Sequence, residues 1–447
     1  MYNLRQTLIL CAAPALLMAA EPLVWPPVLP GGKAVVTDTA PSFLTPGPNL
    51  REGVAIAKTA PAVDFLYYPG QDYLGKPWSV WGDGLAVGDK YYSAIGDHKA
   101  PDGNAGLYEY DATTKRLRRL VDLRELLKLP DGHYTPGKIH SRIDLGKDGW
   151  LYFSTHRGST RITTEKYHYK GDWIVRHHPQ RGVTEVVAHA PLPRQCLPAS
   201  VLDPERLIYY AGTADGDVQN KRVQFLAYDI QNKRVLYSDD HGFARCAIFA
   251  RSTGRLYFHA TGKEGATDEG PAKLVRFDPA KPGPPVLIEA ALGLRAATEE
   301  LPDGRVYTIE QDAMWEFNTK TEKAQLLGPA IVGSLTYTAS LHADAKTGRY
   351  LYYVPGAHGG AERDGTPLVQ YDVKTRTRKV IAFLRAHYEK QYGYIPQGTY
   401  GTAVSPDGAT VYITWNGNRG AAPNARKIDF NTCALMAVHI PAAERKP

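Results

Sequence analysis

One pattern recurs seven times along the chain and limits what the chain can fold into. Each unit contains a strand of small residues, a turn that often carries Asp-Gly, a strand rich in Tyr and Phe, and a third strand that ends near Tyr-Asp. A short fourth strand follows in every unit but the last. The units span residues 78–122, 138–188, 196–238, 246–289, 295–327, 340–383 and 400–440. Repeats of this length and strand content are typical of β-propeller blades.

The repeat therefore predicts an all-β fold, a seven-bladed β-propeller with four antiparallel strands in each blade. The last unit lacks a fourth strand, and we expect an N-terminal strand, from residues 54–58 or 63–68, to supply it and close the ring. The 28 Tyr, 42 Gly and 33 Pro agree with many short strands and turns. We expect a Pro-rich extended segment at residues 21–50 and a single propeller domain at residues 51–447.

Residues 1–20 have the features of an export signal peptide. Arg5 gives a positively charged start, and the apolar stretch that follows ends in the small residues Ala19 and Ala20. This stretch is too short for a membrane span, and no other segment is apolar enough to cross a membrane. The sequence therefore predicts a secreted or periplasmic protein without membrane insertion.

The formal net charge is +7. A positive charge favours encounter with a polyanion. Because the chain is expected to be exported and has no run of basic residues, we do not expect nucleic acid as its partner.

Histidine and arginine side chains recur at equivalent places in the repeat. In a blade of antiparallel strands, the start of the first strand and the end of the second lie on the same rim. The residues expected on this rim are His98, His140, His156, His259 and His358, together with Arg222, Arg245 and Arg295. Binding residues commonly gather on loops held by a rigid scaffold. The pattern therefore predicts a binding site at one end of the central channel.

Several stretches resemble the β-propeller ulvan lyases, a family of polysaccharide lyases. They are "SVWGDG", "YYSAIGDH", "PGKIHSRIDLGKDGWLYFSTHRGS", "IYYAGT", "RLYFHATG", "YLYYVPGAHGG", "PLVQYDVKT" and "GTYGTAVSPDG". The resemblance runs from about Trp78 to Asn416, and oligogalacturonate lyases are similar at a greater distance. It implies cleavage of an anionic, uronate-containing and sulfated polysaccharide by β-elimination, without a catalytic cofactor.

The resemblance also implies roles for individual residues. His140 in "GKIH" is similar to the family's functional histidine, and Tyr210 in "IYYAGT" to its catalytic tyrosine, with Tyr209 as the alternative. Arg222 is expected to neutralise the uronate carboxylate. The family often has a second histidine after "GKIH", for which His156 is the candidate. We expect His98, Tyr209, Arg245, His259 and Arg295 to bind substrate.

A structural zinc is a further implication of the resemblance. His241, Cys246, His342 and His358 are the expected ligands, although they lack the close spacing of most zinc motifs. Besides Cys11 in the signal segment, the chain has Cys196, Cys246 and Cys433, so one disulfide, free thiols or a metal ligand all remain open.

Other functions remain open at this point. A glycan-binding propeller without activity would keep the same rim, and a lyase for pectin or another uronate polymer would use the same chemistry. A metal-dependent hydrolase would need a carboxylate cluster, for which Glu299, Glu300 and Asn416 are the only indications. The sequence gives no sign of a partner chain, so we expect a monomer.

Overall fold

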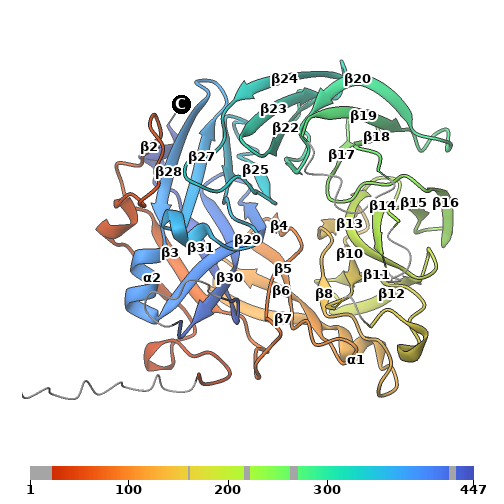
Figure 1. Cartoon of the computed structure of the whole chain (residues 1–447), viewed down its shortest axis with the longest axis horizontal. Helices are drawn as coiled ribbons and strands as arrows, with labels where there is room; N and C mark the ends of the chain where they lie inside the picture. Colours follow the sequence, from red (N-terminus) through yellow and green to blue (C-terminus); the bar gives the residue numbers. More distant parts are fainter. Residues whose placement is uncertain (1–22, 160–161, 216–221, 262–269, 422–428, 447) are drawn as a thin grey trace, which may run out of the picture.

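The structure, a computed structural model, describes residues 23–159, 162–215, 222–261, 270–421 and 429–446. The predicted signal peptide and Cys11 lie outside these residues. Seven sheets follow one another around a common centre, so the fold is a seven-bladed β-propeller as predicted (Figure 1). The first strand of each blade lies nearest the centre and the later strands lie progressively further out.

The blades are numbered in chain order. Blade 1 contains β4 (Leu85–Val87), β5 (Lys90–Gly96), β6 (Ala105–Asp111) and β7 (Arg116–Asp122). Blade 2 contains β8 (Lys138–Ile139), β9 (Asp144–Leu145), β10 (Leu151–His156), β11 (Trp173–His178) and β12 (Val183–His189). Blade 3 contains β13 (Gln195–Asp203), β14 (Ile208–Asp215), β15 (Phe225–Asp229) and β16 (Arg234–Asp239). Blade 4 contains β17 (Ala247–Ala250), β18 (Arg255–Phe258), β19 (Ala272–Phe277) and β20 (Val286–Leu292).

The remaining blades include strands from the start of the chain. Blade 5 contains β21 (Ala296–Ala297), β22 (Arg305–Glu310), β23 (Ala313–Asn318) and β24 (Lys323–Gly328). Blade 6 contains β25 (Leu341–Ala343), β26 (Tyr350–Tyr353), β27 (Pro367–Asp372) and β28 (Thr377–Phe383), with β2 (Ala55–Ile56) parallel to β28. Blade 7 contains β29 (Tyr394–Val404), β30 (Thr410–Arg419), β31 (Thr432–His439), β3 (Ala62–Tyr67) and β1 (Val36–Asp38).

Blade 7 joins distant parts of the chain. β3 runs antiparallel to β31, with Ala62 opposite His439 and Tyr67 opposite Ala434 (Figure 1). β1 then pairs with β3 at the outer edge, so part of the Pro-rich segment adds a strand to this sheet. The buried Asp64 carboxylate of β3 accepts hydrogen bonds from Thr37 and Lys115, which holds β1 and blade 1 against this strand.

Neighbouring blades pack face to face through apolar cores. There are seven such clusters among the described residues, one between each pair of adjacent blades. Strands in the middle of a blade are therefore covered on both faces. In β14, for example, Tyr209 packs into the core shared with blade 2, and Tyr210 into the core shared with blade 4.

Helices are short and lie between blades. α1 (Leu123–Leu127) follows β7, and the Asp122 side chain caps it by accepting a hydrogen bond from the Glu125 amide. α2 (Arg385–Tyr392) precedes β29. Within the described ranges, no helix has the length and apolar character that a membrane span requires. Cys196, Cys246 and Cys433 are all free thiols, so no disulfide forms among them.

The position of β3 yields a stability prediction. Phe65 is fully buried in the core between blades 6 and 7. We expect Phe65→Ala to lower the free energy of unfolding by about 3–5 kcal/mol, because it removes a large buried side chain and leaves a cavity. Chemical denaturation measures this change. Val24→Ala is the control, since Val24 is 69% exposed, and equal stability of both variants would contradict a structural role for β3.

Candidate active site

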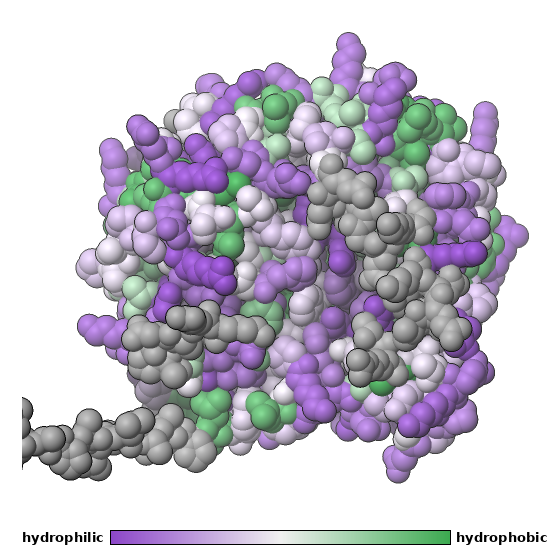
Figure 2. All heavy atoms as spheres, viewed as in Figure 1, coloured by the Kyte–Doolittle hydropathy of each residue, from purple (hydrophilic) through white to green (hydrophobic). Residues whose placement is uncertain are grey.

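A central pocket lies where the innermost segments of the blades meet. Every blade contributes at least one lining residue: Trp81, His140, Pro198, Arg245, Arg295, Ala339 and Tyr400. The pocket volume is about 50 Å³. These residues lie in, or just before, the innermost strands of their blades. Figure 2 shows one face of the propeller, where hydrophilic side chains are abundant.

Trp81 lies at the centre of a ring of aromatic side chains. Its ring centroid is 5.5 Å from that of His98, 6.0 Å from His140, 5.7 Å from His358 and 5.1 Å from Tyr400. The His140 ring is stacked on the indole, with an interplanar angle of 19°. Trp81 thus brings together groups from blades 1, 2, 6 and 7.

A hydrogen-bonded chain of hydroxyl, imidazole and guanidinium groups forms one wall. The Tyr400 and Tyr337 hydroxyl oxygens are 3.0 Å apart, and the Tyr400 hydroxyl also bonds Nε2 of His358. Arg295 donates to the Tyr337 hydroxyl, and its guanidinium lies 4.3 Å from the centre of the Tyr337 ring. The Tyr400 hydroxyl is therefore held in place by two partners.

His140 and His156 are both positioned by backbone carbonyls. Nδ1 of His140 lies 3.0 Å from the Pro198 carbonyl, and Nδ1 of His156 lies 2.6 Å from the Arg157 carbonyl. A carbonyl oxygen only accepts, so Nδ1 carries the hydrogen in both rings. Burial, followed by nearby cations, holds the pKa of both side chains well below the ordinary value. Both imidazoles are therefore neutral at pH 7, with the Nε2 lone pair available to accept a proton.

Positive charge is concentrated on the same side of the channel. Lys138 is the partner of His156 in the pairing of β8 with β10, and its amine lies 4.3 Å from the Trp81 ring centre. Burial, with the cations Arg157 and Arg245, lowers the pKa of Lys138 to about 7. In the described part of the chain, no carboxylate pairs with Lys138 or Arg245. The part of the pocket beside Lys138 and Arg245 therefore favours an anionic group.

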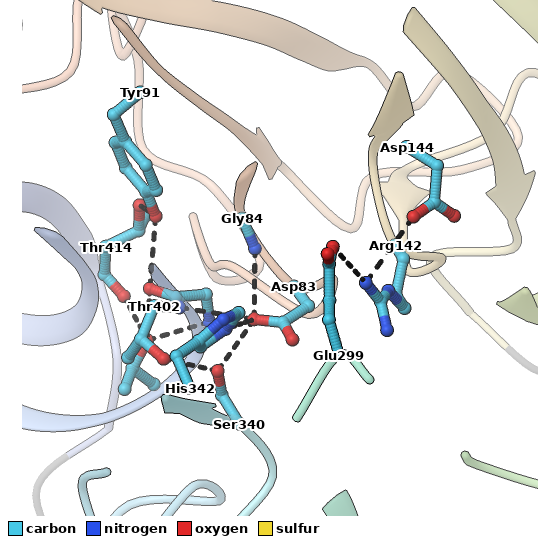
Figure 3. A network of polar contacts seen from close by, with 12 residues as sticks. Asp83, Gly84, Tyr91, Arg142, Asp144, Glu299, Ser340, His342, Thr402 and Thr414 are labelled. Atoms are coloured by element: carbon cyan, nitrogen blue, oxygen red, sulfur yellow. Dashed lines mark hydrogen bonds and ion pairs between the residues drawn. The ribbon is translucent and has the colours of Figure 1, made fainter. Parts of the chain in front are cut away.

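Further down the channel, opposite charges pair with each other (Figure 3). Nη2 of Arg142 lies 3.5 Å from Oδ1 of Asp144 and 3.3 Å from Oε1 of Glu299. The Asp83 carboxylate accepts from the Ser340 hydroxyl and lies 3.1 Å from Nε2 of His342. Asp83 and Arg142 also line the central pocket, so this channel-floor network places the carboxylates of Asp83, Asp144 and Glu299 below the cations Lys138 and Arg245.

The structure brings together many of the predicted rim residues. His140, Arg245 and Arg295 line the central pocket, His98 contacts Trp81, and the His156 ring is 5.2 Å from that of His140. His358, expected as a zinc ligand, lies on Trp81 and Tyr400 instead.

Other predicted residues lie elsewhere. The expectation that one of Tyr209 and Tyr210 faces the cleft fails, because β14 is covered on both faces and each ring enters a core. Arg222 is exposed, and its guanidinium lies 4.0 Å from the carboxylate of Asp240, which follows the outer strand β16. His259 follows β18, is half-buried and does not line the pocket.

The four expected zinc ligands do not form one site. His241 is exposed near Asp239, Cys246 lies in the central pocket wall, and His342 bonds Asp83. Across the described ranges, no three His, Cys, Asp or Glu side chains are placed to hold a metal ion together. Glu299 and Glu300 also pair with cations or hydroxyl groups.

Sequence reasoning did not assign roles to Trp81, Lys138, Tyr337 and Tyr400. Tyr400 stands at the predicted start of the seventh repeat unit, and Lys138 lies two positions before His140. Their positions in the sequence could therefore have indicated that both lie on the functional rim. Trp81 and Tyr337 precede the first strands of their blades, in segments without a regular pattern.

Comparison with known protein families and with characterised proteins finds no match. Among solved structures, the fold is similar to an oligogalacturonate lyase in complex with manganese, at 12% identity and a TM-score of 0.50, covering 93% of this chain and 98% of that one. A chain of the mitotic checkpoint complex is 10% identical with a TM-score of 0.47, covering 98% and 99%. U3-55K is 10% identical with a TM-score of 0.47, covering 83% and 98%. At 12% identity, the similarity to the oligogalacturonate lyase concerns the propeller fold alone.

The two neighbouring tyrosines of β14 provide a matched stability test. The Tyr210 hydroxyl is buried without a hydrogen-bond partner in the described residues, whereas the Tyr209 hydroxyl donates to Ser154 Oγ at 2.9 Å. We expect Tyr210→Phe to leave the free energy of unfolding unchanged or raised, and Tyr209→Phe to lower it by about 1 kcal/mol. Urea denaturation compares them, and a larger loss for Tyr210→Phe would contradict these positions.

Proposed function

We propose that this protein is a polysaccharide lyase that cleaves a uronate-containing polymer by β-elimination. One observation carries the proposal: a neutral histidine, a held tyrosine hydroxyl and a cation line one pocket, at His140, Tyr400 and Arg245, and the Lys138 amine lies over the Trp81 ring in the wall of that pocket. These are the groups that such a reaction requires, and they come from blades 2, 4 and 7.

The reaction makes three demands on the site. A base removes the proton on C5 of the uronate, the electron pair forms the double bond between C4 and C5, and the bond from C4 to the glycosidic oxygen breaks. The departing oxygen takes a proton from an acid. A cation beside the C5 carboxylate stabilises the negative charge that develops on its oxygens.

The proposed roles follow from the contacts. His140 accepts the C5 proton at Nε2, since the Pro198 carbonyl occupies Nδ1. Tyr400 gives its hydroxyl proton to the departing oxygen, and its ring centroid lies 5.7 Å from that of His140. Arg245 and Lys138 neutralise the carboxylate. His156 and His98 position His140 and Trp81 through ring contacts.

The pocket volume constrains how a substrate can bind. About 50 Å³ holds only a few water-sized groups. The carboxylate can therefore enter the central pocket while the sugar ring lies over its mouth. This places the C5 proton close to the pocket wall that carries His140 and Tyr400.

The proposed substrate is a sulfated, ulvan-like uronate polymer, and a pectin-type polymer is the alternative. The similarity to an oligogalacturonate lyase keeps this alternative in view, although it concerns the fold. We propose that the protein is exported to the periplasm or the medium, where it would meet such polymers. We also propose that it acts as a monomer and that no step of the reaction depends on a metal. A glycan-binding protein without activity would share the cationic pocket but produce no unsaturated sugar.

The proposal predicts a rise in absorbance near 235 nm on incubation with ulvan or polygalacturonate, because elimination creates a conjugated double bond. We expect His140→Ala and Tyr400→Phe each to lower kcat by about 10²-fold or more, since each removes a proton-transfer group. His241→Ala is the control, because this histidine is exposed near Asp239. Polymer binding without any absorbance change would favour the glycan-binding function, and full activity of both pocket variants would refute the roles assigned here.

The pH dependence of kcat/KM provides a separate test, since it reports the free enzyme. His140 has a lowered pKa and stays in its basic form below pH 6.5, so activity should persist there. Lys138 has a pKa of about 7 and loses its charge above this pH, so substrate binding should weaken on the alkaline side. Lys138→Arg should shift the alkaline decline of kcat/KM to higher pH, because a guanidinium stays charged. Lys147→Arg is the control, because Lys147 is exposed, does not line the pocket and lies 3.7 Å from the Glu205 carboxylate. If Lys138→Arg leaves the alkaline decline of kcat/KM at the same pH, Lys138 is not its source.

A further inference from the structure

A second, larger cavity adjoins the central pocket on the rim of blade 7. Its volume is about 520 Å³, and its walls include Lys76, Leu335, His358, Gly359, Arg363 and Phe430. His358 connects the two sites, because its ring also contacts Trp81 and bonds the Tyr400 hydroxyl. A molecule in this outer cavity would therefore lie directly beside the proposed reaction centre.

The two volumes suit different parts of one ligand. The central pocket is too small for a sugar ring, whereas the outer cavity lies within the range of small-molecule binding sites. A polymer whose carboxylate enters the central pocket has neighbouring sugar units that must lie across the rim. The outer cavity is the large hollow next to His358 that can receive them.

The walls of the outer cavity combine apolar and backbone surfaces. Phe430 and Leu335 are partly exposed, and Gly359 and Gly360 lie between them in left-handed conformations, with φ of +96° and +98°. A Cβ atom at Gly359 would come within 3.1 Å of the Phe430 ring, so the absence of a side chain keeps this surface open. Flat apolar surfaces of this kind suit the faces of sugar rings.

Two cations lie at the edge of the outer cavity. Lys76 and Arg363 are exposed, and neither forms an ion pair within the described ranges. The nearby Glu362 carboxylate is buried and accepts from the Gly360 amide at 2.9 Å. Asp429 is the other acidic side chain in this wall. Lys76 and Arg363 are thus placed to meet the carboxylate or sulfate groups of an anionic sugar.

We infer that the outer cavity binds the anionic sugar units next to the cleaved bond, with Phe430 contacting a ring face and Lys76 and Arg363 contacting its charged groups. The inference rests on the proposed function and adds a direction: the polymer leaves the central pocket past His358 and crosses the rim of blade 7. Affinity for long substrates then comes partly from contacts outside the reaction centre.

The test compares substrate lengths. For the double variant Lys76→Ala/Arg363→Ala, and separately for Phe430→Ala, we expect KM for ulvan or polygalacturonate to rise roughly tenfold with kcat nearly unchanged. KM for the shortest oligosaccharide that the wild-type protein cleaves should rise less than about twofold. The control is Lys233→Ala/Arg234→Ala, which removes two exposed positive charges, one from the turn after β15 and one from the first residue of β16.

A second measurement separates this inference from the proposed function. Native electrophoresis in gels that contain either polymer reports binding without any need for turnover. If the wild-type protein is retarded but inactive, and the Lys76/Arg363 and Phe430 variants lose the retardation, the proposed lyase activity fails and the cavity assignment stands. If these variants are retarded as much as the control variant, the cavity assignment is overturned. It is also overturned if KM rises by the same factor for long and short substrates.

Discussion

Face-to-face packing between neighbouring sheets is the constraint on which the rest of the structure depends. Each blade buries one face against the preceding blade and the other against the following one, so no sheet has a solvent-exposed face to spare. The middle strands must therefore be apolar on both sides. Polar side chains are left to the inner strands, the outer strands and the two rims. This division decides where chemistry can occur before any catalytic residue is considered.

The candidate site follows from this division. Inner segments present alternate residues to the channel, as His140, Arg142 and Asp144 do in blade 2. The upper positions hold uncompensated cations and aromatic rings, whereas the lower ones hold carboxylates that pair with arginines. An anionic ligand is thus favoured at one end of the channel only. The same geometry explains why one small pocket receives side chains from all seven blades.

The repeat allowed much of this to be predicted. Blade number, the common rim and the grouping of His98, His140, His156, Arg245 and Arg295 all follow from the position of each residue within its unit. The assignment of Tyr210 failed because resemblance of a short motif does not reveal that both faces of β14 are covered. The four expected zinc ligands do not form one site, for a related reason. His342 lies in β25 and His358 follows β26, and their partners, Asp83 and Tyr400, lie on other blades where no periodicity indicates the contact.

The pairing of β3 with β31 has a consequence for how the molecule is made. Blades 1 to 5 are each built from a continuous stretch of chain and can form as synthesis proceeds. Blade 7 combines β3 with β29, β30 and β31, so it cannot assemble until β31 has been made. Contacts between such distant segments form slowly because a long loop must close first. Until then, blades 6 and 1 expose apolar faces, and a nascent chain in this condition would be the form most in need of a chaperone.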